Sequence, residues 1–158
     1  MEKKLLINLF KLSHVPRWSV CDMIKSQTVS DHSFRVEVIA VYLIDKLKLP
    51  LNKGDVVLSI MFHDSSEGET GDIPSNFKSA NQVLEPSGSP EKALLRLSDS
   101  IEAAIQLARY GKNPTRVMRF LERKLQFTQN EISTYFDIPV LTVSEAVDNL
   151  IMVGKNYD

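Results

Sequence analysis

The sequence predicts an all-α protein, a single bundle of helices. Two observations carry this prediction: apolar residues recur at three- and four-residue steps along most of the chain, and no stretch shows the alternation of a half-buried strand. The 158 residues suit one domain, and 43% hydrophobic with 25% charged residues is the composition of a globular protein with a substantial core. We therefore predict one domain over residues 1–158, with its core in about residues 5–125 and closing helices in about residues 128–153.

Three helices are expected in the first half of the chain. Apolar residues between Leu5 and Leu12 form one face of an amphipathic first helix. Ser30 is a suitable N-cap for a second helix, and Pro50 ends it. A third helix covers about residues 53–66 and is apolar on more than one side, which indicates a central position. The glycines and the proline that follow predict a loop.

The second half opens with the clearest helix start in the sequence. Ser89 is a good N-cap, and Pro90 is favourable at the first helical position. The helical pattern then runs to Tyr110, where Gly111 ends it. A further helix is expected to begin at Pro114. Two shorter helical patterns follow, over about residues 128–137 and 141–153.

The charge and the cysteine content exclude several classes of protein. With 19 basic and 20 acidic residues the net charge is −1, so the chain has no long-range attraction for nucleic acid. The single cysteine, Cys21, excludes an internal disulfide and is typical of a reducing cytosol. Asn8, Lys11 and His14 interrupt the apolar N-terminal run, so we expect a cytoplasmic location with neither a signal peptide nor a membrane span.

The chemistry in the sequence is concentrated in "MFHDSSEGETGD", residues 61–72, which follows an apolar helical run. If the third helix continues, Glu67 lies one turn after His63 and Asp64 on the same face. His32, near the start of the preceding helix, lies on the flank of an apolar stripe and is expected to point toward neighbouring helices. Two imidazoles and a carboxylate can bind a divalent cation, and without a thiolate such a site is of the catalytic kind.

A purely structural interpretation of these residues is also open. Taken alone, His32 is more often a satisfied or half-exposed histidine than a metal ligand. Acidic residues near a helix end usually form a solvated rim. The metal site is favoured only by the combination of the two histidines with the acids that follow them.

The order His32, His63-Asp64, Asp99 along predicted helices resembles the HD-domain metal-dependent phosphohydrolases. Four blocks resemble its bacterial 5′-deoxynucleotidase branch and the compact phage enzymes that hydrolyse dATP: "RWSV" at 17–20, "VSDHSFRVEVIA" at 29–40, "MFHDSSEGETGDIPSNFK" at 61–78 and "LSDSIEAA" at 97–104. The resemblance covers about residues 5–110, and its most specific part is the pattern HDxSExxTGDxP. It implies that the helical bundle is a single HD domain.

The resemblance also implies a set of site residues. It implies one divalent transition metal, with zinc, cobalt or manganese expected, bound by His32, His63, Asp64 and Asp99. It implies catalytic roles for Glu67 and Asp72 as carboxylates that orient water, accept its proton or protonate the departing oxygen. It further implies that phosphate is held by Arg17 and Lys78, and that Trp18 packs at the sugar and helps to exclude a 2′-hydroxyl.

The residues by themselves leave the assignments of four of these residues open. On a helical wheel Asp99 lies away from the apolar stripe of its helix, so the pattern alone indicates a solvated acid. Arg17 and Lys78 read without the motifs are ordinary surface cations. Trp18, the only tryptophan, is by composition alone a core residue.

The implied reaction is hydrolysis of 5′-phosphates from deoxynucleotides by a metal-activated water. The short segment between Lys78 and Asp99 is similar to that of the compact phage enzymes. It favours dATP, with dADP and dAMP as further substrates, giving deoxyadenosine plus phosphate or triphosphate. A triphosphate would bring an additional Mg²⁺. A strict 5′-deoxynucleotidase acting on dNMPs is the alternative. The resemblance also implies a homo-oligomer, a dimer or a hexamer, in the cytosol of a bacterium or of a phage-infected host.

Two other classes of function stay in view. The spacing within residues 128–153 is that of a helix-turn-helix, which makes a DNA-binding protein a distant alternative. Its would-be recognition helix, however, carries Glu145 and Asp148 and no lysine or arginine, whereas phosphate contacts need cations. The other class is an HD-type protein that has lost its activity and acts only by binding other molecules. The complete set of motif residues argues against it.

Overall fold

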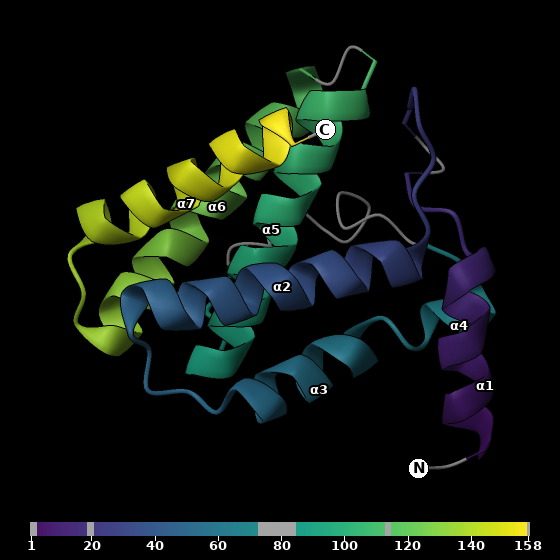
Figure 1. Cartoon of the computed structure of the whole chain (residues 1–158), viewed down its shortest axis with the longest axis horizontal. Coiled ribbons are helices and arrows are strands. Elements are labelled where there is room, and N and C mark those ends of the chain that lie inside the picture. Colours follow the sequence, from purple (N-terminus) through teal and green to yellow (C-terminus); the bar gives the residue numbers. More distant parts are fainter. Residues whose placement is uncertain (1–2, 19–20, 73–84, 113–114, 158) are drawn as a thin grey trace.

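The computed structural model describes residues 3–18, 21–72, 85–112 and 115–157, and they form the helical bundle of Figure 1. These residues contain no β-strand, only two isolated bridges, Pro16 with Thr28 and Met23 with Gly111. The all-α prediction is confirmed. The helices are α1 (Lys3–Lys11), η1 (Leu12–His14), α2 (Val29–Leu47), α3 (Lys53–His63), α4 (Glu67–Thr70), α5 (Pro90–Tyr110), α6 (Thr115–Phe136) and α7 (Val140–Asn156).

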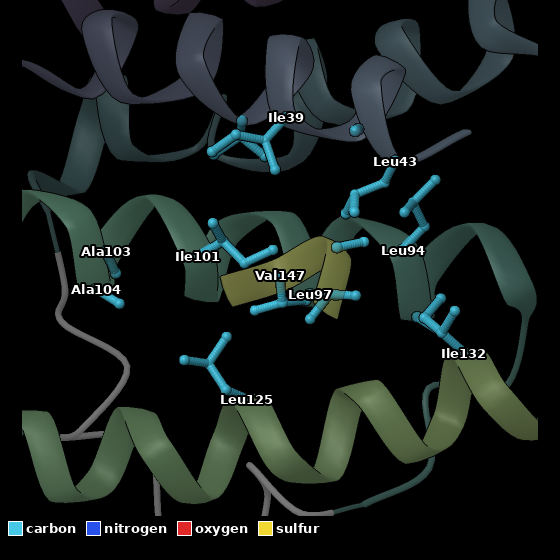
Figure 2. Close-up of a cluster of buried hydrophobic side chains, with 14 of the residues drawn as sticks. Ile39, Leu43, Leu94, Leu97, Ile101, Ala103, Ala104, Leu125, Ile132 and Val147 are labelled. Atoms are coloured by element: carbon cyan, nitrogen blue, oxygen red, sulfur yellow. The ribbon is translucent and has the colours of Figure 1, made fainter. Parts of the chain in front are cut away.

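Helix α5 is the centre of the bundle, because α2, α3, α6 and α7 all pack against it. Its residues from Ala93 to Leu107 are buried around most of the circumference of the helix. Figure 2 shows the two sides of this core: Ile39 of α2 approaches α5 from one side, and Leu125 of α6 from the other. Burial of this continuous apolar surface is the main force that holds the helices together.

The start of α2 differs from the prediction by two residues. Its N-cap is Thr28, whose hydroxyl accepts a hydrogen bond from the backbone N–H of Asp31, while the Asp31 carboxylate accepts one from the backbone N–H of Thr28. This reciprocal capping box satisfies two backbone donors at the start of the helix. Ser89 caps α5 as predicted, by accepting a hydrogen bond from the N–H of Lys92.

Helix α3 ends at His63, three residues before the predicted end, and the short helix α4 begins at Glu67, where a loop was expected. Three polar residues in a row, Asp64 to Ser66, separate the two helices, and such side chains compete for backbone hydrogen bonds. The prediction that Glu67 follows His63 on one helical face is therefore wrong. Helix α4 packs on α1 instead (Figure 1).

The two helices predicted around residues 114–125 and 128–137 form one continuous helix, α6, of 22 residues. Thr128, at the expected break, is fully buried, and its hydroxyl donates to the carbonyl of Lys124 within the same helix. With no glycine or proline there, nothing ends the helix. The helix-turn-helix alternative is weakened, since α7 packs on α5, α6 and α2. Among the described residues, none of the helices has the length and apolar character to cross a bilayer.

Candidate metal centre

The four residues expected to bind the metal lie close together, and three of them, His32, His63 and Asp99, form one group of converging ligand atoms. His32 lies in the first turn of α2, His63 ends α3 with Asp64 as its C-cap, and Asp99 lies in the middle of α5. The Nε2 atom of His32 lies 3.2 Å from Oδ1 of Asp99 and 3.9 Å from Oδ2 of Asp64. Nε2 of His63 lies 3.0 Å from the same Asp64 oxygen. One ligand atom each of His32, His63 and Asp99 lies within 4.8 Å of the others, so this group can hold a metal ion.

Both imidazoles are fixed with Nε2 facing the cluster. Nδ1 of His32 lies 2.7 Å from Oε2 of Glu102, a carboxylate that can only accept, so Nδ1 carries the proton of the neutral ring. Nδ1 of His63 donates in the same way to the backbone carbonyl of Ile60. Each neutral ring therefore directs its Nε2 lone pair toward the two aspartates, as metal ligation requires.

The burial of this arrangement shows that it fits a cation. His32 is completely buried, and within the described part of the chain its Nε2 has no hydrogen-bond partner, because the nearby oxygens of Asp64 and Asp99 can only accept. Buried polar atoms are almost always satisfied. Either a proton on the ring or a metal ion between nitrogen and carboxylate satisfies these atoms, and the N and O donor set is one that divalent transition metals bind.

Without a metal, the neighbouring carboxylates favour the protonated form of both histidines. Burial and the charge of Arg17 lower the pKa of His32, but Glu102 and Asp99 outweigh them and raise it above its usual value. Burial likewise lowers the pKa of His63, but the hydrogen bond and charge of Asp64, the carbonyl of Ile60 and the charge of Asp99 together outweigh this and raise it. Burial raises the pKa of Asp99, yet the charge of Lys124 and the contact with His32 hold that pKa well below its usual range.

Asp99 is not the solvated acid that the helical wheel alone indicates. Its side chain is only 20% exposed, and its two oxygens face different partners. Oδ1 faces His32, while Oδ2 lies 2.7 Å from Nζ of Lys124 on α6. The wheel was misleading because α5 is buried on nearly every side, so a residue away from the main apolar stripe is still inside the protein.

Arg17 lies beside the cluster. Its guanidinium nitrogens are 3.7 Å from Oδ2 of Asp64 and 4.0 Å from Oδ1 of Asp99, and its side chain is 13% exposed. The structure thus excludes the reading of Arg17 as an ordinary surface cation. Its guanidinium also lies 5.6 Å from the centre of the Trp18 ring, within the range of a cation–π contact.

Asp72 fixes the backbone next to Arg17. Its Oδ2 accepts a hydrogen bond of 2.9 Å from the N–H of Trp18, 54 residues away in the sequence. Trp18 has φ +65°, a left-handed conformation that is uncommon for a bulky residue, and this bond helps to hold it. The ring of Trp18 is buried. The structure therefore gives Asp72 a positioning contact in addition to the catalytic role expected for it.

The remaining two expected residues differ in what the structure shows. Glu67 is buried at the start of α4. Its backbone N–H donates a hydrogen bond of 2.9 Å to the carbonyl of Asp64, so the backbone of Glu67 contacts a residue of the cluster. Lys78 lies outside the described residues.

Two buried residues of the site are not among those expected from the sequence, Glu102 and Lys124. Besides contacting His32, Glu102 accepts a hydrogen bond of 2.6 Å from Gln27 and lies 3.6 Å from Arg35. A signal for Glu102 exists in the sequence, because it is a charged residue inside the apolar run "SIEAAI", three residues after Asp99. No comparable signal marks Lys124, whose contact with Asp99 depends on the packing of α6 against α5.

The fold is that of an HD-domain phosphohydrolase. The structure superposes on the HD phosphohydrolase DatZ of cyanophage S-2L, solved bound to dA and one catalytic Zn²⁺ ion, over 99% of this chain and 98% of that chain, with a TM-score of 0.77 and 18% sequence identity.

The chain belongs to the YfbR-like 5′-deoxynucleotidase family, which matches residues 4–109. It is 32% identical to a 5′-deoxynucleotidase of Vibrio cholerae over 87 residues, 52% of this chain and 45% of that protein. It is 33% identical to the 5′-deoxynucleotidase YfbR of Salmonella arizonae over 81 residues, 49% of this chain and 41% of that protein. The matches thus span less than half the length of these curated relatives.

Proposed function

We propose that this protein is a metal-dependent phosphohydrolase that removes 5′-phosphates from deoxynucleotides. The observation that carries the proposal is the convergence of two correctly oriented imidazoles and two aspartates beside a buried arginine. The family supports it, since the relatives are named as 5′-deoxynucleotidases. The similar phage protein, bound to dA and zinc, supports a deoxynucleotide substrate and a metal.

The metal would be held by His32, His63, Asp64 and Asp99, and zinc, cobalt and manganese all suit these nitrogen and oxygen donors. When bound, a divalent cation supplies Lewis acidity, which activates water near neutral pH and polarises the phosphoryl group. The additional Mg²⁺ expected for a triphosphate would arrive with the substrate. The remaining steps are carried by the side chains around the cluster.

Arg17 is placed to receive the phosphate. Its guanidinium stands within 4.0 Å of carboxylates of both Asp64 and Asp99, so an anion brought to the cluster is next to a cation. Within the described residues, Nε of Arg17 and the indole N–H of Trp18 are buried donors without an acceptor. A substrate rich in oxygen atoms supplies acceptors for both, and neutralising charge on the phosphoryl oxygens lowers the barrier to cleavage.

The acids handle protons and position the substrate. Glu67, buried next to Asp64, would orient the attacking water and accept its proton. Asp72 would protonate the departing 5′-oxygen while its bond to the N–H of Trp18 holds the tryptophan in place. Trp18 would pack at the sugar and disfavour a 2′-hydroxyl. Lys78 would add a second contact to the phosphate.

For the substrate we favour dATP, followed by dADP and dAMP, with deoxyadenosine and phosphate or triphosphate as products. The match to the phage protein over nearly the whole of both chains favours this compact type. The second candidate is a strict 5′-deoxynucleotidase that acts on dNMPs, and the names of the family and of the curated relatives favour it.

One experiment separates the two candidates. The protein is loaded in turn with Zn²⁺, Co²⁺ or Mn²⁺ and incubated with each dNTP, dNDP, dNMP and ribonucleotide, and both products are identified by chromatography. Deoxyadenosine with triphosphate or phosphate from dATP supports our proposal. Turnover of dNMPs alone supports the second candidate. Turnover of no deoxynucleotide with any of these metals contradicts both.

A further inference from the structure

We propose that Lys124 of α6 is a second phosphate-binding cation of the site, acting together with Arg17. This inference rests on the proposed function. Lys124 lies outside the family match over residues 4–109, yet its ammonium group reaches the metal centre. The residue is only 7% exposed, and Nζ lies 2.7 Å from Oδ2 of Asp99.

Lys124 and Arg17 occupy matching positions around Asp99. Arg17 stands 4.0 Å from Oδ1, and Lys124 stands 2.7 Å from Oδ2. The two cations are far apart in the sequence, and each lies beside a different oxygen of one expected metal ligand. Lys124 thus pairs with the Asp99 oxygen that Arg17 does not approach.

A lysine in this position does not serve the metal. Both are positive, so Lys124 repels a divalent cation, and its ion pair makes the Asp99 carboxylate a poorer ligand. Orienting Asp99 needs only a neutral hydrogen-bond donor. The species that gains from a cation here is an anion, and in the proposed reaction the anion is the phosphate of the substrate.

The charges around the centre indicate why a second cation is needed. When both histidines are neutral, the two negative charges of Asp64 and Asp99 cancel the charge of a divalent cation. The charge of Glu102 is balanced by Arg35, whose guanidinium lies 3.6 Å away. Glu67, as the proposed base, is then left with one negative charge, and the phosphate of the substrate adds at least one more. Among the described residues, Arg17 and Lys124 together balance them, and Arg17 alone does not.

The other interpretation is that Lys124 only ties α6 to α5. The two interpretations differ in what a Lys124→Met variant loses. If Lys124 serves the anion, phosphate binding weakens while metal affinity stays the same or rises. If it is only a structural tie that holds Asp99, metal affinity and phosphate binding fall together.

The test uses the metal-loaded full chain. Inorganic phosphate binding is measured by calorimetry, and Mn²⁺ or Zn²⁺ affinity by competition with a chromophoric chelator, for the wild type, Lys124→Met and Lys124→Arg. Arg123→Met is the matched control, because Arg123 is the neighbouring cation on α6 and is exposed. Lys124→Gln, which keeps a polar donor, is measured as well in case Lys124→Met does not fold.

We expect Lys124→Met and Lys124→Gln to weaken phosphate binding roughly 10- to 100-fold, the size of a lost hydrogen bond to a charged group. Lys124→Arg should recover most of this loss, and Arg123→Met should bind phosphate like the wild type. Unchanged phosphate binding in folded Lys124→Met or Lys124→Gln, or a parallel fall in metal affinity, overturns the inference. A wild type that binds no metal overturns the proposed function as well.

Discussion

The two nitrogens of His32 explain most of the chemistry at the scale of single residues. Nδ1 donates to Glu102, and Nε2 is therefore left as a buried lone pair directed at Asp64 and Asp99. The family resemblance, in the order His32, His63-Asp64 and Asp99, predicted that these residues lie together. It did not predict Glu102, because the contact joins residues 70 positions apart and depends on how α2 packs against α5.

Removing Glu102 should weaken metal binding. Glu102→Ala deletes the acceptor that orients His32 and makes it more basic, and losses of about 10- to 100-fold in metal affinity are usual for such partners. Glu102→Gln, which keeps an acceptor oxygen, should lose less. The measurement is chelator competition, with the exposed Glu122→Ala on α6 as control. Wild-type affinity in a folded Glu102→Ala variant would show that Glu102 does not position the ligand.

Metal binding should weaken as the pH decreases, and the weakening should begin at a higher pH than it would for histidines with the usual pKa. The pKa values of His32 and His63 are both raised above 6.5 in the metal-free protein, so protons compete with the metal already above that pH. The same shifts stabilise the metal-free fold fully below 6.5, and this stabilisation is lost as pH rises through the raised values. Metal titrations and urea unfolding of the metal-free protein across this range measure both trends. Metal affinity that is constant across it would contradict the assignment.

A substitution of Glu67 should lower the rate of hydrolysis without lowering the affinity for the metal. Glu67→Ala is expected to retain the metal and to lose turnover by roughly 10²- to 10⁴-fold, the usual contribution of general acid–base catalysis. His63→Ala and Asp64→Ala should instead lose the metal itself. Metal content by mass spectrometry and single-turnover rates distinguish the two kinds of loss. A Glu67→Ala variant with wild-type turnover rules out its proposed role.

At the scale of elements, local signals predicted both ends of α5, at Ser89 and at Gly111. Ser89 and Pro90 mark the start of α5 correctly, because a cap depends on adjacent residues. The end of α3 and the continuity of α6 were missed. The first follows from the polar residues Asp64 to Ser66, which compete for backbone hydrogen bonds, and the second from a buried Thr128 that bonds within its own helix.

Gly68 is a position where the backbone of one element packs closely on the backbone of another. A Cβ there would lie 2.6 Å from the backbone oxygen of Asn8 in α1. Alanine usually stabilises a helix interior relative to glycine, by up to about 1 kcal/mol. We predict the opposite sign for Gly68→Ala, a loss of about 1–3 kcal/mol from overpacking, measured by urea unfolding. A gain in stability would show that α4 and α1 are not in this close contact.

The whole molecule assembles a centre that no single segment contains. The proposed ligands come from α2, from the end of α3 and from α5, while Arg17 precedes α2 and Lys124 comes from α6. The family resemblance predicted the ligand set, while hydrophobic periodicity alone placed Asp99 in solvent. Periodicity describes one helix at a time, and the burial of α5 on nearly every side is a property of the bundle.

Self-association into a dimer or a hexamer stays a prediction. Phe34, Val38, Val153 and Tyr157 are exposed on α2 and at the end of α7, where they line a cavity of about 370 Å³. Exposed apolar patches of this kind mark interfaces. Sedimentation velocity should show an oligomer that Val153→Glu weakens and that Leu58→Glu, on α3, leaves intact. A wild type that sediments as a monomer at all concentrations contradicts the prediction.

The most direct test of the central claim is an anomalous diffraction map of crystals of the protein soaked in Mn²⁺ or Zn²⁺. The account predicts a strong peak within about 2.0–2.3 Å of Nε2 of His32, Nε2 of His63 and one oxygen each of Asp64 and Asp99. A map with no peak among these four side chains, or with its strong peak elsewhere, would contradict the metal centre and the hydrolysis proposed for it.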